Sequence, residues 1–151
     1  CPNFLSKRVI PMEFRFDSSM MGTLGVGCNL LKLSEEELNI CKEKIARYKE
    51  IRHIVQDGKF YRLQGNLVDN DYHVFEYVNK DEALLFVFLP QSKVGHRFTT
   101  IKLRGLDENK DYKFNLFGQD IVKSGRYLMN HGLTVKLEGD YASLVLYIKE
   151  V

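Results

Sequence analysis

The sequence of 151 residues contains no tryptophan, three prolines and three cysteines. Cys1, Cys28 and Cys41 are odd in number and form no C-x-x-C pair, which argues against a disulfide framework and a zinc site and favours a reducing, cytoplasmic compartment. No stretch approaches the about 20 apolar residues that span a bilayer, and no signal-peptide pattern opens the chain. Because the first residue is not methionine, we expect the true beginning of the protein to lie upstream.

An excess of charge of one sign is also missing. The 22 basic and 20 acidic residues leave a net charge of +2, and the signs alternate along the chain. Proteins that bind nucleic acids usually show a basic stripe. Here the densest basic stretch, Lys42–Arg52, is interleaved with Glu43 and Glu50, which is typical of a solvated helix face. We therefore expect neither a nucleic-acid partner nor a membrane partner.

The clearest helical pattern runs from Ser34 to about Glu50. Apolar residues recur there at three- and four-residue spacing: Leu38, Cys41, Ile45 and Tyr48. Ser34 and Glu37 form a capping box, and an acidic first turn suits the positive end of the helix dipole. The acidic cluster Glu35–Glu37 therefore has a structural explanation, and we assign it no catalytic role.

Beyond Gly58 the pattern changes to short runs rich in β-branched and aromatic residues, separated by turn clusters. The runs are Phe60–Leu63, His73–Val78, Ala83–Leu89, Thr99–Leu103, Tyr112–Leu116, Leu133–Leu137 and Ser143–Lys149. Short strands at this spacing are typical of an antiparallel sandwich. The sequence thus predicts a mainly β protein, with a C-terminal antiparallel β-sandwich over residues 59–151.

The first 58 residues predict a different unit. Glu13–Asp17 has the alternation of a strand, a glycine-rich stretch from Met20 to Gly27 follows it, and the capped helix comes next. Strand, loop and helix make one βα unit. A single strand must find partners for its backbone groups, so a lone unit of this kind predicts a piece of something larger.

No residue pattern predicts a self-sufficient catalytic site. On a strand, Glu13 and Asp17 would lie roughly 13 Å apart between their Cα atoms, whereas the carboxyl groups of retaining glycosidases lie about 5 Å apart. The histidines are spread singly, without metal-ligand spacing: His53, His73, His96 and His131. Asp69–Asp71 lacks the glycine and distal glutamate of a calcium loop, and Gly22, Gly25 and Gly27 do not match a dinucleotide fingerprint. We expect no catalytic residue, metal or cofactor.

A carbohydrate-binding module is the alternative from another class. Sugar platforms expose aromatic rings, but the chain has no tryptophan, and the alternating aromatic residues fall where a core is expected: Phe75, Tyr77, Phe86 and Phe88. Outward-facing Tyr72, Tyr112 and Tyr127 aligned on one face would favour the binding module. An interaction module for assembly into a homo-oligomer is compatible with either interpretation.

Several segments together resemble the family 36 glycoside hydrolases, chiefly α-galactosidases. They are Pro2-Asn3 with Arg8, Pro11 and Glu13-Phe14-Arg15; Met20-Met21-Gly22-Thr23-Leu24-Gly25; Leu33-Ser34-Glu35-Glu36-Glu37; Tyr48-Lys49-Glu50-Ile51-Arg52; Val55-Gln56-Asp57-Gly58; Leu103-Arg104-Gly105-Leu106; and Leu128-Met129-Asn130-His131-Gly132-Leu133. The similarity covers nearly the whole chain in the family's order. One departure is Asp17, which stands where the family usually has histidine.

The resemblance implies that residues 1–58 are the last βα unit of a truncated (β/α)₈ barrel and residues 59–151 the C-terminal sandwich. It implies a parent enzyme that hydrolyses terminal α-galactosides such as melibiose and raffinose with retention and without a cofactor. Both catalytic aspartates would lie upstream, in the remainder of the barrel. Met20, Met21 and Gly22 would either border the substrate, since barrel active sites gather at this face, or pack in the core.

Overall fold

The computed structural model describes residues 5, 7–64, 72–93 and 98–151 and is mainly antiparallel β, as predicted. The main sheet has the order β1-β2-β3-β8-β5-β6, and β4 pairs with β7 in a separate ladder. The strands are β1 (Lys59–Gln64), β2 (His73–Asn79), β3 (Glu82–Leu89), β4 (Thr99–Ile101), β5 (Asp111–Leu116), β6 (Gln119–Ser124), β7 (Leu133–Val135) and β8 (Ala142–Glu150). The helices are α1 (Met12–Ser19), the 3₁₀ turn η1 (Leu30–Lys32), α2 (Glu35–Asp57) and α3 (Gly125–Asn130).

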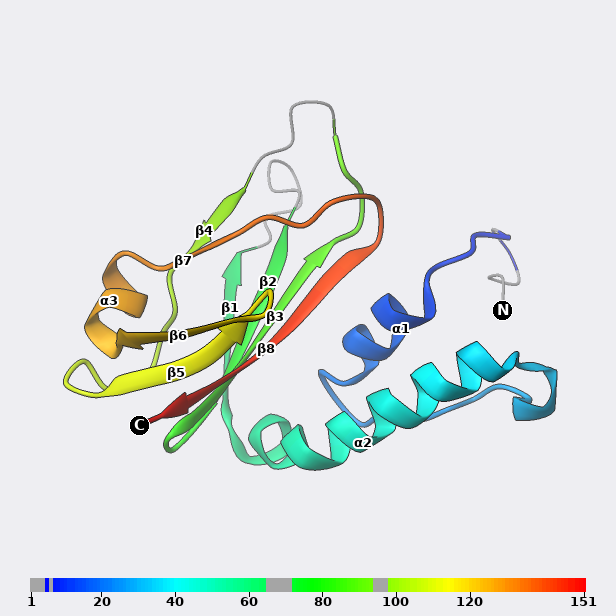
Figure 1. Cartoon of the computed structure of the whole chain (residues 1–151), viewed down its shortest axis with the longest axis horizontal. Coiled ribbons are helices and arrows are strands. Elements are labelled where there is room, and N and C mark those ends of the chain that lie inside the picture. Colours follow the sequence, from blue (N-terminus) through cyan, green and yellow to red (C-terminus); the bar gives the residue numbers. More distant parts are fainter. Residues whose placement is uncertain (1–4, 6, 65–71, 94–97) are drawn as a thin grey trace.

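The main sheet is covered on both faces. Figure 1 shows α1 and α2 on one side of it and β4, β7 and α3 on the other. All residues of β3 from Ala83 to Leu89 are buried, which explains why this strand is a continuous apolar run and not an alternating one. Leu85 and Val87 face the sandwich interior, whereas Leu84 and Phe86 face the helices. The helical unit and the sandwich therefore share one of the two cores.

Each predicted β run overlaps a strand of the structure, but β6 and α3 were missed. In β6 only Ile121 and Ser124 are partly buried, so the strand has little of the alternation that marks a covered face. It forms because a two-residue turn returns the chain from Leu116 to Gln119. Phe117 and Gly118 both have positive φ in that turn, 51° and 83°, as hairpin turns of the primed types require.

The predicted strand Glu13–Asp17 is wrong, because these residues lie in helix α1. Alternation over five residues does not exclude a helix. Phe16 and Met20 are four positions apart, a spacing that puts both side chains on one face of a helix. Both side chains are buried. Pro11 stands at the N-terminal cap, where its missing N–H costs nothing, and Glu13 in the first turn suits the helix dipole. A helix satisfies its own backbone, which a lone strand does not.

Helix α2 confirms the predicted capping box and extends further than predicted. Ser34 Oγ accepts from the Glu37 N–H at 3.2 Å, and Glu37 Oε2 accepts from the Ser34 N–H at 2.9 Å. The helix continues past Glu50 to Asp57 because its apolar face continues with the buried Ile51, Ile54 and Val55. It ends at Gly58, where an added Cβ would lie 2.2 Å from the carbonyl oxygen of Ile54.

We expect Ser34→Ala to lower the free energy of unfolding by about 1 kcal/mol, because the Glu37 N–H loses its acceptor. Ser34→Asp restores a capping oxygen and serves as the matched control. Thermal melts followed by circular dichroism measure both. An unchanged melting temperature for Ser34→Ala, with unchanged helix content, would contradict the energetic role of this cap.

Candidate functional site

Two tyrosine hydroxyl groups hold the loop Met20–Gly22. Tyr77 on β2 donates to the Met21 carbonyl oxygen at 2.6 Å, and Tyr48 on α2 donates to the Gly22 carbonyl oxygen at 2.7 Å. Met20 is 1% exposed and packs in the core under α2, whereas Gly22 is exposed and an added Cβ there would meet nothing within 4 Å. The loop is therefore held by the two tyrosines on its core side and is exposed on the other side. Met20 points into the core, and Gly22 lies on the exposed side.

The segment 23–27 after this loop has no helix or strand assignment and joins neither sheet. An added Cβ at Gly25 or Gly27 would meet nothing within 4 Å. Val26 in this segment and Leu30 and Leu31 in η1 just after it are 40%, 49% and 95% exposed. One side of this segment is therefore uncovered within the described part of the chain.

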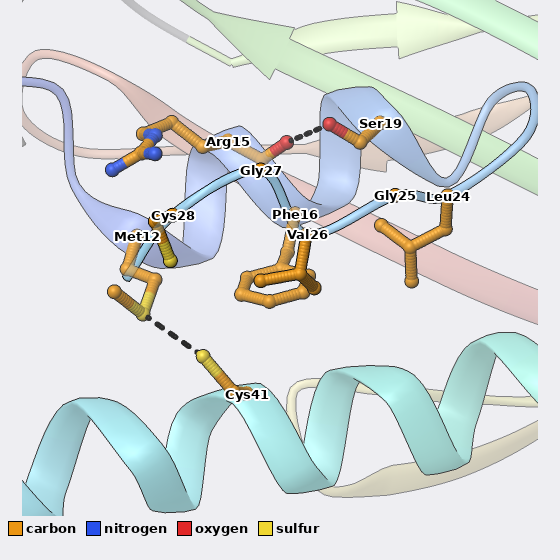
Figure 2. Close-up of a pocket in the computed structure, with 10 residues that line it drawn as sticks. All are labelled: Met12, Arg15, Phe16, Ser19, Leu24, Gly25, Val26, Gly27, Cys28 and Cys41. Atoms are coloured by element: carbon orange, nitrogen blue, oxygen red, sulfur yellow. Dashed lines mark hydrogen bonds between the residues drawn. The ribbon is translucent and has the colours of Figure 1, made fainter. Parts of the chain in front are cut away.

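A cavity of about 250 Å³ lies between α1, this segment and α2 (Figure 2). Its lining consists of Met12, Arg15, Phe16, Ser19, Leu24, Gly25, Val26, Gly27, Cys28 and Cys41. Cys41 Sγ lies 3.7 Å from Met12 Sδ, and Ser19 Oγ donates to the Arg15 carbonyl oxygen at 2.8 Å. The cavity is lined by sulfur and apolar side chains, glycine backbone, one serine and one arginine, and none of these lining residues carries a carboxylate.

The Cα atoms of Glu13 and Asp17 lie closer together in helix α1 than they would in a strand, but the two carboxylates do not form a catalytic pair. One helical turn separates their Cα atoms by only about 6 Å. Glu13 is exposed, however, and both carboxylate oxygens of the buried Asp17 are occupied. Lys44 Nζ lies 2.5 Å from Oδ1, and Ser143 Oγ donates to Oδ2 at 2.7 Å. Asp17 therefore links α1, α2 and β8 and does not present a free carboxylate.

A second buried acid, Glu76, lies in the middle of β2 and is fully buried. Its Oε2 accepts from the Arg104 N–H at 2.8 Å, and its Oε1 has no hydrogen-bond partner among the described residues. Burial raises the pKa of this carboxyl group to about 8, against the opposing effects of the Arg104 N–H and the Arg104 charge. The group is accordingly neutral at pH 7, and it holds the loop after Leu103 and not a substrate.

Glu82 on β3 is the centre of a further polar cluster at the end of α2. His53 Nε2 lies 2.6 Å from Glu82 Oε2, and Tyr147 donates to Glu82 Oε1. Burial raises the pKa of Glu82, but the hydrogen bonds from Tyr147 and His53 and the charges of His53 and Lys149 outweigh it, so that the pKa lies below its usual value. Burial and the carboxylate raise the pKa of Tyr147. Both oxygens of Glu82 are occupied, so the cluster ties α2 to the sheet.

A hollow of about 420 Å³ on the helix side of the sheet brings Arg47, Lys113, Asp120 and Tyr147 together. The charges of these residues are already paired: Lys113 lies 2.9 Å from Asp120, and Arg47 lies 3.5 Å from Glu50. The Arg47 guanidinium also covers the Tyr147 ring, 5.7 Å from its centroid. No free functional group is directed into this hollow from those four residues.

The other residues considered as metal ligands in the sequence, the histidines and the Asp69–Asp71 turn, lie only partly within the described residues. His96 and the turn Asp69–Asp71 lie outside the described residues. Over the described ranges, no group of three histidine, cysteine, aspartate or glutamate side chains is placed to hold a metal ion. The rings of His131 and Tyr127 lie in tilted contact, with centroids 5.1 Å apart.

The tyrosines that the sequence offered as a sugar platform do not align on one exposed face. Phe86, Phe88 and Tyr77 are buried under the helices, as the core interpretation predicts. Tyr72 and Tyr112 are buried too, and of the three candidate platform tyrosines only Tyr127 is exposed. The three tyrosines whose alignment on one face would favour a carbohydrate-binding module therefore do not form such a surface.

Fold and site together define a β-sandwich joined to a helical unit that has an uncovered side. The family model described as glycosyl hydrolase family 36 C-terminal domain matches residues 72–148, and the Melibiase model matches residues 1–58. The chain belongs to glycosyl hydrolase family 36.

Curated relatives align with the whole chain. α-Galactosidase AgaA of Geobacillus stearothermophilus is 31% identical over 152 residues, and α-galactosidase Mel36A of Lactobacillus acidophilus is 32% identical over 151 residues. Both alignments cover 99% of this chain but 20% of the relative, so the chain spans about a fifth of the length of these enzymes.

Solved structures give the same picture. A crystal structure of the AgaA enzyme in complex with raffinose superposes with a TM-score of 0.90 at 29% identity, and one in complex with stachyose gives 0.90 at 30%. Each covers 99% of this chain and 21% of the solved chain. Within the described residues, no helix has the length and apolar character needed to span a membrane.

Proposed function

We propose that this chain is the non-catalytic C-terminal part of a retaining α-galactosidase whose complete form hydrolyses terminal α-galactosides such as melibiose and raffinose. The observation that carries the proposal is the alignment of 99% of the chain with only a fifth of AgaA, at a TM-score of 0.90. The carboxylates in the chain support it, because Asp17, Glu76 and Glu82 are all engaged in structural contacts.

In this proposal residues 1–58 supply the last βα unit of the (β/α)₈ barrel and residues 59–151 the C-terminal sandwich. Since Glu13–Asp17 is helical, the barrel strand of that unit falls in the segment after Gly22, which joins neither sheet. The exposed Val26, Leu30 and Leu31 beside it need a cover. The remainder of the barrel, preceding this chain, is the partner that supplies both a neighbouring strand and that cover; a second copy in a homo-oligomer would bury the same side chains.

The sandwich then serves as a support for the barrel end. Its sheet buries one face of α2 and, through Tyr77 and Ser143, holds the Met20–Gly22 loop and Asp17. We infer that Met20, Met21 and Gly22 border the galactose pocket of the complete enzyme, with Gly22 facing the sugar and Met20 packing beneath it. The free thiols of Cys28 and Cys41 support a cytoplasmic location.

We expect the purified chain to release no product from an aryl α-galactoside above the uncatalysed rate, because the carboxylates of Asp17, Glu76 and Glu82 are engaged in structural contacts and the catalytic aspartates of the family are expected upstream. Full-length AgaA in the same assay is the positive control. Turnover that disappears in Glu13→Ala or Asp17→Ala, while the variants stay folded, would contradict the non-catalytic role.

A chimera tests the partner. AgaA with its C-terminal fifth replaced by this chain should protect amides 23–27 from hydrogen exchange, whereas the isolated chain should exchange them fast. Protection of these amides in the isolated monomer would contradict an uncovered barrel strand.

A further inference from the structure

Three sulfur-containing side chains from three separate stretches line the same cavity. Met12 comes from α1, Cys41 from α2, and Cys28 from the segment between them (Figure 2). Cys41 Sγ and Met12 Sδ lie 3.7 Å apart. Cys28 is close enough for its charge to raise the pKa of Cys41, after the larger effect of burial. The cavity therefore concentrates soft donor atoms, with Cys41 at its buried end and the half-buried Cys28 toward solvent.

Thiolate and thioether ligands together select soft cations, and Cu(I) above all among the biological metals. Two sulfur atoms bound to one ion at about 2.3 Å lie about 3.7–4.0 Å apart, which the Met12–Cys41 distance already satisfies. A structural zinc ion needs four ligands. The described residues provide no histidine or carboxylate to complete such a set here, so the site suits an ion that accepts two or three sulfurs.

A positively charged side chain also lines the cavity and can offset the net charge of a bound metal complex. Cu(I) bound by two thiolates has a net charge of −1, and such a group is costly in a mostly apolar cavity unless a cation accompanies it. Arg15 lines the same cavity and makes no ion pair with the described residues. It acts on the pKa of Cys41 in the direction opposite to burial, Cys28 and Glu37. Figure 2 shows this guanidinium group at the exposed rim of the cavity, turned away from Cys41, so it supplies positive charge near the site without contacting the thiol.

We propose that Met12, Cys28 and Cys41 form a binding site for a soft monovalent cation, Cu(I), with Arg15 as the balancing charge. Binding replaces the two thiol protons: Cu(I) and two thiols give the bis-thiolate complex and two protons, with no change of oxidation state. The Met12 thioether is the third donor. The proposal concerns the chain itself and does not depend on the proposed function.

The test uses the whole chain carrying Cys1→Ser, so that Cys28 and Cys41 are the remaining thiols. The reduced protein competes anaerobically with bicinchoninate for Cu(I), and copper–thiolate absorption in the ultraviolet reports the complex. We expect one ion per chain. Cys28→Ser or Cys41→Ser should abolish it, and Met12→Leu should weaken it about tenfold or more, a usual size for impaired metal sites. Met129→Leu, in α3, is the matched control and should bind normally.

Circular dichroism of each variant before titration separates loss of the ion from loss of the fold. Several results would overturn the proposal: no Cu(I) retained against bicinchoninate, binding that survives Cys41→Ser, or binding indifferent to Met12→Leu. A product two hydrogens lighter and free of copper would also overturn it, since it would show that the thiols form a disulfide instead.

Discussion

Asp17→Ala is expected to lower the free energy of unfolding by about 3 kcal/mol, because it leaves an ammonium and a hydroxyl group without their acceptor at a largely buried junction. The Asp17 side chain is 5% exposed and that of Lys44 is 25% exposed. Lys44 can therefore recover part of its hydration, which keeps the estimate at the lower end of the range for broken buried pairs. For a domain of this size the loss corresponds to a fall in melting temperature of about 10 °C.

Two variants make the Asp17 experiment specific. Glu13→Ala, on the same helix but exposed, should change stability little. Asp17→Asn keeps an acceptor for Ser143 and loses the ion pair, so it should fall between wild type and Asp17→Ala. Hydrogen exchange should show α1 opening first. Equal melting temperatures for Asp17→Ala and Glu13→Ala would mean that the junction carries no stability.

The sequence could predict elements whose signals are local. The Ser34–Glu37 capping box fixes the start of α2 by contacts within four residues, and the β-rich runs outlined every strand with a covered face. The Glu13–Asp17 stretch failed because five residues satisfy a period of two and a spacing of four equally well. Packing of Phe16 and Met20 under the sheet, which lies far along the chain, decided for the helix.

The site was harder to predict because its contacts join distant residues. Asp17 and Ser143 are 126 positions apart, and neither carries a pattern that announces the other. Glu76 did leave a signal: it shares its side of the strand with the buried Val74, so strict alternation would have predicted a carboxyl group inside the sandwich. Its partner, the backbone N–H of Arg104, carries no side-chain signature.

That buried carboxyl group should make the stability of the protein depend on pH. In the folded protein the pKa of Glu76 is raised to about 8 by burial, while in the unfolded chain it is about 4.3. At pH values between these two pKa values, the carboxyl group is therefore protonated in the folded state and ionised in the unfolded state. The stabilising contribution is fully present below about pH 4 and is lost progressively as pH rises toward 8, by about 1.4 kcal/mol per pH unit.

Glu76→Gln removes this dependence, because the amide stays neutral and its oxygen still accepts from the Arg104 N–H. We expect the variant to match wild type near pH 4 and to exceed it by about 3.6 kcal/mol at pH 7 and about 5 kcal/mol at pH 9. Urea unfolding at several pH values measures the difference. Glu43→Gln, on the exposed side of α2, is the control and should follow wild type. Parallel stability curves for wild type and Glu76→Gln between pH 5 and 8 would show that the buried carboxyl titrates at its ordinary pKa.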